Sequence, residues 1–223
     1  MNLSELHRRL LADVLAIGTP YPLIITGGYA VQAHGLVDRL SQDLDVATEN
    51  PAPLTDIAHA VERGLIQRGW AVTVISVDPL SARLVATVPA TGEDCEVDIL
   101  KENLWAPPVE TEYGLVLALP DVIGTKVRAL ADRGAVRDLI DVHAAAENHT
   151  TNDLERLGER HGRDEFRLQD LHDRLAGAEW YDDEEFAAYG LTEAETSRLR
   201  AWAQQWASNL NQRLGADEDD HEI

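Results

Sequence analysis

The sequence predicts an α+β fold, with a small mixed sheet and flanking helices in residues 1–118 and a helical region in residues 119–223. Two observations support this prediction. Three short runs rich in Val and Ile, at 71–77, 82–88 and 95–100, are separated by turn-forming segments, as is typical of sequential antiparallel strands. Later in the chain the apolar residues recur at helical spacing.

Two long helices are expected in the first region. Residues 4–17 have Ser4 as a suitable N-cap and an apolar stripe that repeats every three or four residues. A second helix is predicted from Thr55, as its N-cap, to about Arg68. Residues 101–114 lack a regular pattern and are predicted to be irregular.

A strand and a glycine turn lie between these two helices. Residues 23–26 are predicted to form a buried strand, Gly27 and Gly28 a turn, and residues 29–34 a short helix. A glycine turn that opens a helix presents free backbone N–H groups to an anion.

Two aspartates follow on the next predicted strand. Asp43 and Asp45 are two residues apart, so their side chains point to the same face of that strand. Mg²⁺ that also holds substrate phosphates prefers such oxygen ligands. Together with the glycine turn, the pair predicts a nucleoside triphosphate site.

The second region is predicted to be helical. Helices are expected from Pro120 to Ala131 and over residues 136–147, and the last helix begins with a capping box over residues 192–195. Trp202 and Trp206 lie on the apolar stripe of that helix, where core packing is favoured over a surface for a partner helix. The acidic segment from about residue 216 is expected to be disordered.

Composition restricts the cellular context and the partners. The chain carries 44% hydrophobic residues, one cysteine and a net charge of −21. It has neither an apolar run long enough to span a bilayer nor a recognisable secretory signal, so we expect a cytoplasmic protein without a membrane partner. The acidic surface disfavours polyphosphate backbones and suits a cationic partner, although solubility or salt adaptation explains it equally well.

A third aspartate extends the predicted site. Asp98 lies near the end of an apolar strand, and its carboxylate would join Asp43 and Asp45 if the two strands were neighbours. Such a cluster needs cations, because like charges that close raise each other's pKa. One or two Mg²⁺ ions would relieve the repulsion and orient a triphosphate for in-line displacement. The alternative for Asp98 is a charged strand end that faces water.

Two segments resemble a known family. GGYAVQAHGLVDRLSQDLDV (27–46) resembles the glycine and Asp-x-Asp signature of the polymerase-β-like nucleotidyltransferase fold, and GTKVRALADRGAVRDLIDVHAA (124–145) resembles the Lys…Arg-Asp-x-x-Asp segment of its AbiEii/AbiGii toxin branch. The resemblance covers roughly residues 20–146. Gly28 stands where many relatives have serine.

The resemblance implies roles for individual residues. Asp43 and Asp45 would be metal ligands, and Asp98 would be a third carboxylate that ligates metal or acts as a base. Lys126 would contact the triphosphate, and Asp141 would order Lys126 or assist proton removal. The implied cofactor is Mg²⁺, for which Mn²⁺ could substitute, and the implied donor is an NTP.

Further residues are candidates for binding the nucleotide. Arg39 and Ser41 precede the aspartates and could reach phosphate oxygens, although a solvated loop is an equal alternative. Arg137 is four residues before Asp141 and can share its helix face. Arg83, on a strand, could contact the nucleotide or extend to solvent. The remaining candidates are Gly27, Gly28 and Lys126.

We therefore expect Mg²⁺-dependent transfer of a nucleoside monophosphate (NMP) from an NTP to an acceptor hydroxyl. The resemblance implies an RNA acceptor such as tRNA and a cognate antitoxin. Because of the acidic charge, an antibiotic nucleotidyltransferase with a small cationic acceptor of the aminoglycoside type is the first alternative. The second is a catalytically silent binding module that uses Trp202 and Trp206.

Overall fold

A mixed seven-stranded sheet organises the first half of the chain in the computed structural model, which describes residues 1–38, 41–162 and 166–220. The strand order is β3-β4-β5-β2-β1-β7-β6 within these described residues. The strands are β1 (Ile24–Ile25), β2 (Leu44–Thr48), β3 (Ala71–Val77), β4 (Ser81–Thr87), β5 (Asp94–Lys101), β6 (Val109–Thr111) and β7 (Gly114–Val116). The predicted antiparallel arrangement of β3, β4 and β5 is confirmed.

The segment predicted to be irregular, 101–114, instead contains β6 and the start of β7. These two strands form an antiparallel hairpin at one edge of the sheet, and β7 pairs in parallel with β1. Each has only three residues, which is too short for a period-2 pattern to be recognised in the sequence.

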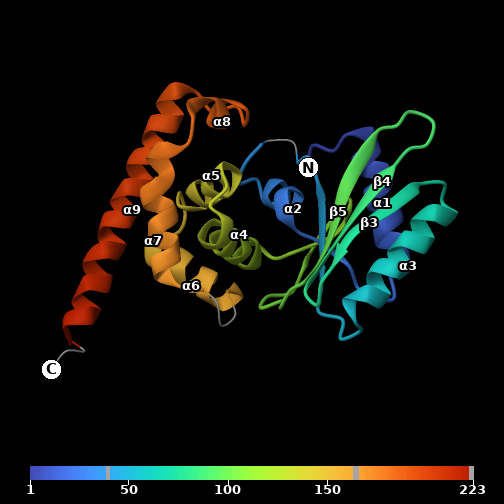
Figure 1. Ribbon diagram of the computed structural model, residues 1–223, viewed down its shortest axis with the longest axis horizontal. Coiled ribbons are helices and arrows are strands. Elements are labelled where there is room, and N and C mark those ends of the chain that lie inside the picture. Colours follow the sequence, from blue (N-terminus) through green and yellow to red (C-terminus); the bar gives the residue numbers. More distant parts are fainter. Residues whose placement is uncertain (39–40, 163–165, 221–223) are drawn as a thin grey trace. The chain divides into compact units, whose positions relative to one another are not determined.

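Helices α1 (Glu5–Ile17) and α3 (Leu54–Gln67) pack against the same face of the sheet (Figure 1). The predicted cap of α1 is confirmed, because Ser4 Oγ accepts a hydrogen bond from the His7 N–H at 3.1 Å. The predicted cap of α3 is wrong: the N-cap is Pro53, and Thr55 is already helical. Proline is suited to a helix start because its φ is already close to helical.

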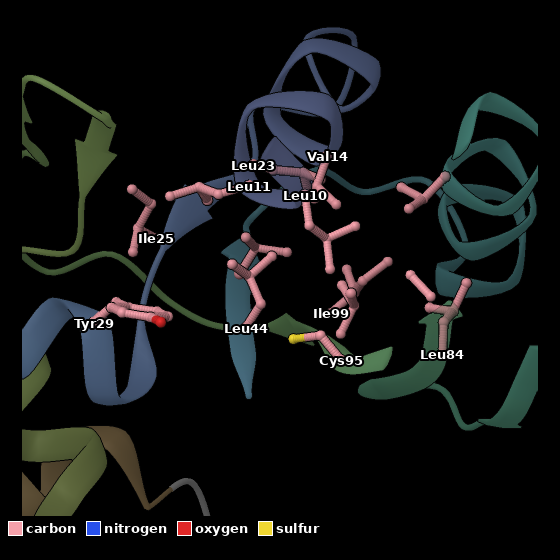
Figure 2. Packing of buried hydrophobic residues seen from close by; sticks show 14 of the residues in the cluster. Leu10, Leu11, Val14, Leu23, Ile25, Tyr29, Leu44, Leu84, Cys95 and Ile99 are labelled. Atoms are coloured by element: carbon pink, nitrogen blue, oxygen red, sulfur yellow. The ribbon is translucent and has the colours of Figure 1, made fainter. Parts of the chain in front are cut away.

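The buried core lies between these helices and the sheet. Figure 2 shows Leu10 and Val14 of α1 above Leu44 and Ile99 of the sheet. Side chains alternate across a strand, and in β4 every second residue is buried. The residues between the buried ones therefore point to the opposite face, away from α1 and α3.

The chain divides into two compact units, Met1–Val122 and Ile123–Ile223. The division falls inside α4 (Leu119–Arg133), whereas the sequence predicts a boundary between residues 118 and 119.

The second unit is helical. Its other elements are α5 (Val136–Ala145), α6 (Thr151–His161), α7 (Leu168–Ala176), a 3₁₀ turn η2 (Gly177–Trp180), α8 (Asp183–Ala187) and α9 (Glu193–Asp220). The predicted capping box of α9 forms, because the Thr192 N–H donates to Glu195 Oε2 at 2.8 Å and the Glu195 N–H donates to Thr192 Oγ1 at 3.4 Å. The backbone of α9 continues to Asp220, into the segment for which the sequence predicts disorder.

The tryptophans of α9 pack inside this unit. Trp206 is buried and its indole N–H donates to Glu155 at 2.8 Å. Trp202 packs against Trp206 and against His143 of α5. The core interpretation of Trp206 is confirmed, so it does not form a partner surface. No helix in the described part of the chain is both long and apolar enough to span a bilayer.

Candidate active site

Three charged side chains lie side by side on the face of the sheet opposite α1 and α3. Asp45 of β2 is the register partner of Asp98 on β5, and Asp98 is the register partner of Arg83 on β4. Register partners on neighbouring strands project to the same face, about 5 Å apart. The condition that brings Asp98 to the aspartate pair, adjacency of the two strands, is therefore met.

The start of α2 (Gly27–Ala33) lies against the Asp45 carboxylate. A Cβ atom placed on Gly27 would be 2.6 Å from Asp45 Cβ and would overlap the carboxylate itself. Gly27 also has a φ of 60°, which side-chain-bearing residues rarely adopt. Gly27 and the buried Gly28 are the first residues of α2, so the helix begins two residues earlier than predicted.

Ser41 positions the carboxylate of Asp43. The buried Ser41 hydroxyl donates to Asp43 Oδ1 at 3.0 Å. Its backbone oxygen accepts a hydrogen bond from the buried Tyr29 hydroxyl at 3.5 Å, and that hydroxyl also contacts His7 Nδ1. Arg39, predicted to bind nucleotide, lies outside the described residues.

Tyr29 and His7 are support residues that sequence reasoning missed. They lie 22 residues apart and meet only because α1 and α2 pack together, so no local spacing indicates their contact. Burial is the main cause that lowers the pKa of His7, and the nearby Asp43 carboxylate partly offsets it. The His7 imidazole, which belongs to this chain of hydrogen bonds, therefore interacts electrostatically with the Asp43 carboxylate.

Arg83 binds both oxygens of Asp98 through one edge of its guanidinium. Its Nε donates to Oδ1 at 2.8 Å and its Nη2 donates to Oδ2 at 2.6 Å, the bidentate geometry of a strong charge-assisted pair. Glu96 lies two residues before Asp98 on the same face, and its carboxylate is 3.2 Å from Nη1 of Arg83. From the sequence, Arg83 is expected either to contact the nucleotide or to extend to solvent, and its ion pair with Asp98 is not predicted.

These residues fit a magnesium ion that is bound together with a substrate. Among the described residues no group of three or more His, Cys, Asp or Glu side chains has the geometry to hold a metal ion on its own. Mg²⁺, however, usually takes only one or two carboxylates together with waters and substrate phosphates. Asp43 and Asp45 can supply those ligands, while the Asp98 carboxylate is paired with the Arg83 guanidinium.

Cys95 faces the core beneath this cluster. Burial, with further contributions from Asp43 and Asp45, raises the pKa of its thiol to about 12. The thiol therefore stays protonated near neutral pH, which argues against a nucleophilic role.

A second charged cluster lies in the helical unit. Lys126 of α4, with 9% of its side chain exposed, places Nζ 2.8 Å from Asp141 and 3.7 Å from Asp138, both on α5. Asp138 in turn accepts two hydrogen bonds from Arg133, at 2.7 and 2.9 Å. The two aspartates therefore share a face of α5, as their spacing predicts, and the Lys126–Asp141 pair has the geometry needed for Asp141 to order the lysine.

The predicted site residues thus fall into two groups. Asp43, Asp45 and Asp98 lie in the first unit, with Gly27, Gly28 and Ser41. The second unit contains Lys126, Asp141 and the half-buried Arg137.

Comparisons with known proteins identify the fold. The chain is similar in structure to JHP933 from Helicobacter pylori, with 19% identity, a TM-score of 0.52, and coverage of 99% of this chain and 100% of that one. It is also similar to MenT4, a nucleotidyltransferase toxin from Mycobacterium tuberculosis, with 18% identity, a TM-score of 0.54, and coverage of 95% and 92%. The predicted polymerase-β-like nucleotidyltransferase fold is confirmed. No curated protein matches the sequence.

The family model described as the nucleotidyl transferase AbiEii toxin of type IV toxin–antitoxin systems matches residues 9–210. That range includes both charged clusters, and the family assignment sets aside the catalytically silent binding module. The chain is a nucleotidyltransferase and belongs to the AbiEii toxin family.

Proposed function

We propose that this protein transfers an NMP from a Mg²⁺-bound NTP to a hydroxyl of an RNA acceptor, with tRNA as the first candidate. The proposal rests on one observation: Arg83, Asp98 and Asp45 are register partners on three neighbouring strands, and the Asp45 carboxylate lies against Gly27. It supplies oxygen ligands beside a helix start, an arrangement suited to a metal-bound triphosphate.

The chemistry follows from charge neutralisation and positioning. When bound, Mg²⁺ would be held by Asp43 and Asp45 and would neutralise the triphosphate. The acceptor oxygen forms a bond to the α-phosphorus, and the bond from that phosphorus to the bridging oxygen breaks. Pyrophosphate leaves with the electron pair, and the hydroxyl proton passes to a carboxylate of the cluster. Lys126, oriented by Asp141, would donate to a phosphate oxygen of the donor.

Family membership and the contacts of the arginines bear on whether the acceptor is an RNA or a small cation. Membership of a toxin family supports an RNA acceptor, because modifying an RNA that all cells need explains toxicity. Two arginines of the helical unit are engaged internally, however: Arg128 donates to the His161 carbonyl at 3.0 Å, and Arg133 binds Asp138. These contacts, together with the net charge of −21 on the chain, favour a small cationic acceptor as the second candidate.

A labelled-nucleotide assay separates these acceptors. The full chain is incubated with Mg²⁺ and each labelled NTP in turn, with total tRNA in one series and aminoglycosides in another. We expect label in the tRNA and none with the Asp45→Ala variant. Label found only in the aminoglycoside would overturn the RNA acceptor, and equal transfer by Asp45→Ala would overturn the site.

We also propose that a cognate antitoxin opposes this activity, because the matched family is one of toxin–antitoxin systems. Coexpression with neighbouring open reading frames in a growth assay tests this: one of them should restore growth, and failure of all of them would contradict the proposal.

A further inference from the structure

Arg83 occupies an unusual place for a cation in a candidate metal site. Its guanidinium binds both oxygens of Asp98, whose side chain is only 14% exposed. The Arg83 side chain itself is 41% exposed, so its outer end can move into solvent. Asp98 is directly opposite Asp45 in the sheet, so Arg83 neutralises a carboxylate beside the candidate metal ligands.

A second acceptor lies within reach of the same guanidinium. Glu96 Oε2 is 3.2 Å from Nη1 of Arg83, and the Glu96 side chain is 49% exposed. Glu96 and Asp98 are two residues apart on β5 and therefore share one face of the sheet. Arg83 can consequently give up Asp98 and keep an ionic partner.

We propose that Arg83 is a positioning residue that competes with the divalent metal for Asp98, and that Glu96 takes over the guanidinium when metal binds. The inference rests on the metal site of the proposed function. Without metal, Arg83 holds Asp98 in place and offsets its repulsion from Asp45. With metal, a guanidinium fixed on Asp98 would repel the dication, so it moves toward Glu96.

Mn²⁺ binding to the full chain tests this inference without any turnover. The dissociation constant is measured by electron paramagnetic resonance of free Mn²⁺, with and without a non-hydrolysable NTP analogue. Arg83→Gln should bind Mn²⁺ about three- to tenfold more tightly than the wild type, the range expected when one partly exposed charged competitor is removed. Arg83→Lys keeps the charge but loses the planar fork, and should return the affinity toward that of the wild type.

Glu96 provides a test in the opposite direction. Glu96→Gln should weaken Mn²⁺ binding about two- to threefold, because Arg83 is then left with Asp98 alone. Loss of a nearby negative charge would also weaken binding without any exchange, so the effect must disappear in the Arg83→Gln background. Arg63→Gln, an exposed site on α3, makes the same change in net charge as Arg83→Gln and should leave the affinity unchanged.

The outcomes separate this inference from the proposed function. If the wild type binds Mn²⁺, Asp45→Asn abolishes binding, and Arg83→Gln binds no more tightly, only the role of Arg83 is overturned. If the wild type binds no Mn²⁺ even with the nucleotide analogue, the metal site and the inference are both overturned. Circular dichroism of each variant shows whether it is folded, and if Arg83→Gln is unfolded, Arg83→Met takes its place, both alone and as the background for Glu96→Gln.

Discussion

Substitution of Gly27 by alanine tests the contact between α2 and the candidate metal ligand. The new methyl group would stand 2.6 Å from Asp45 Cβ and would overlap the carboxylate, so Asp45 or the start of α2 must move. The backbone adds a second cost, because a φ of 60° disfavours a residue with a side chain by about 1–2 kcal/mol. Forcing a methyl group into packed surroundings adds about 1–3 kcal/mol. The total expected loss in unfolding free energy is therefore about 2–5 kcal/mol.

Gly35 provides a matched control for the backbone cost. It also has a positive φ, 69°, but no atom lies within 4 Å of the position that its Cβ would take. Urea unfolding of Gly35→Ala should therefore show the backbone cost alone, and transfer activity should persist. Gly27→Ala should be less stable by a further 1–3 kcal/mol or so and should lose transfer and Mn²⁺ binding. Equal stability of the two variants, with full activity in Gly27→Ala, would refute the placement of Asp45 over the glycine.

Three further predictions concern buried polar groups. Asp141→Asn should lower the unfolding free energy by about 3–5 kcal/mol, because Lys126 keeps a buried charge without its closest partner. Urea unfolding of the double variant Asp141→Asn/Lys126→Met should show a smaller loss, and an equal or larger loss would contradict this explanation. Tyr29→Phe should cost about 1–3 kcal/mol in the same assay and reduce transfer, since its hydroxyl links α1 to the loop before β2; unchanged stability would show that the link is unimportant. Burial lowers the pKa of His7 and of His143, so the stability they contribute is complete above pH 6.5, the ordinary histidine value, and is lost as the pH falls through the lowered pKa values. Urea midpoints measured from pH 8 to pH 5 should therefore decline below pH 6.5, and they should decline less in His7→Asn.

The row of charges also changes how the acidity of the site is understood. From the sequence, three aspartates at one place require added cations. The structure shows that the protein supplies one cation itself, Arg83, on the carboxylate opposite Asp45. Arg83 therefore offsets part of the repulsion between these carboxylates before nucleotide binds.

Local patterns determined much of this protein. The spacing of Asp138 and Asp141 placed both on the side of α5 that meets Lys126. The alternation expected for Asp43 and Asp45 applies to Asp45 only, because Asp43 lies in a bend just before β2 rather than on the strand. The two motifs in order indicated the family, which the match over residues 9–210 confirms. These features depend on neighbours within a few residues, so they can be recognised in the sequence itself.

Only the tertiary structure decided which distant residues meet. Asp45 lies opposite Asp98, 53 positions later in the chain, because β2 and β5 pair in parallel, and no local pattern specifies that register. The partner of Arg83 and the contact of His7 with Tyr29 have the same origin. The hairpin of β6 and β7 escaped prediction because strands of three residues are stabilised by pairing, β6 with β7 and β7 with β1, rather than by their own sequence. Side-chain chemistry and short-range spacing thus define the parts of the site, and long-range strand pairing determines how they meet.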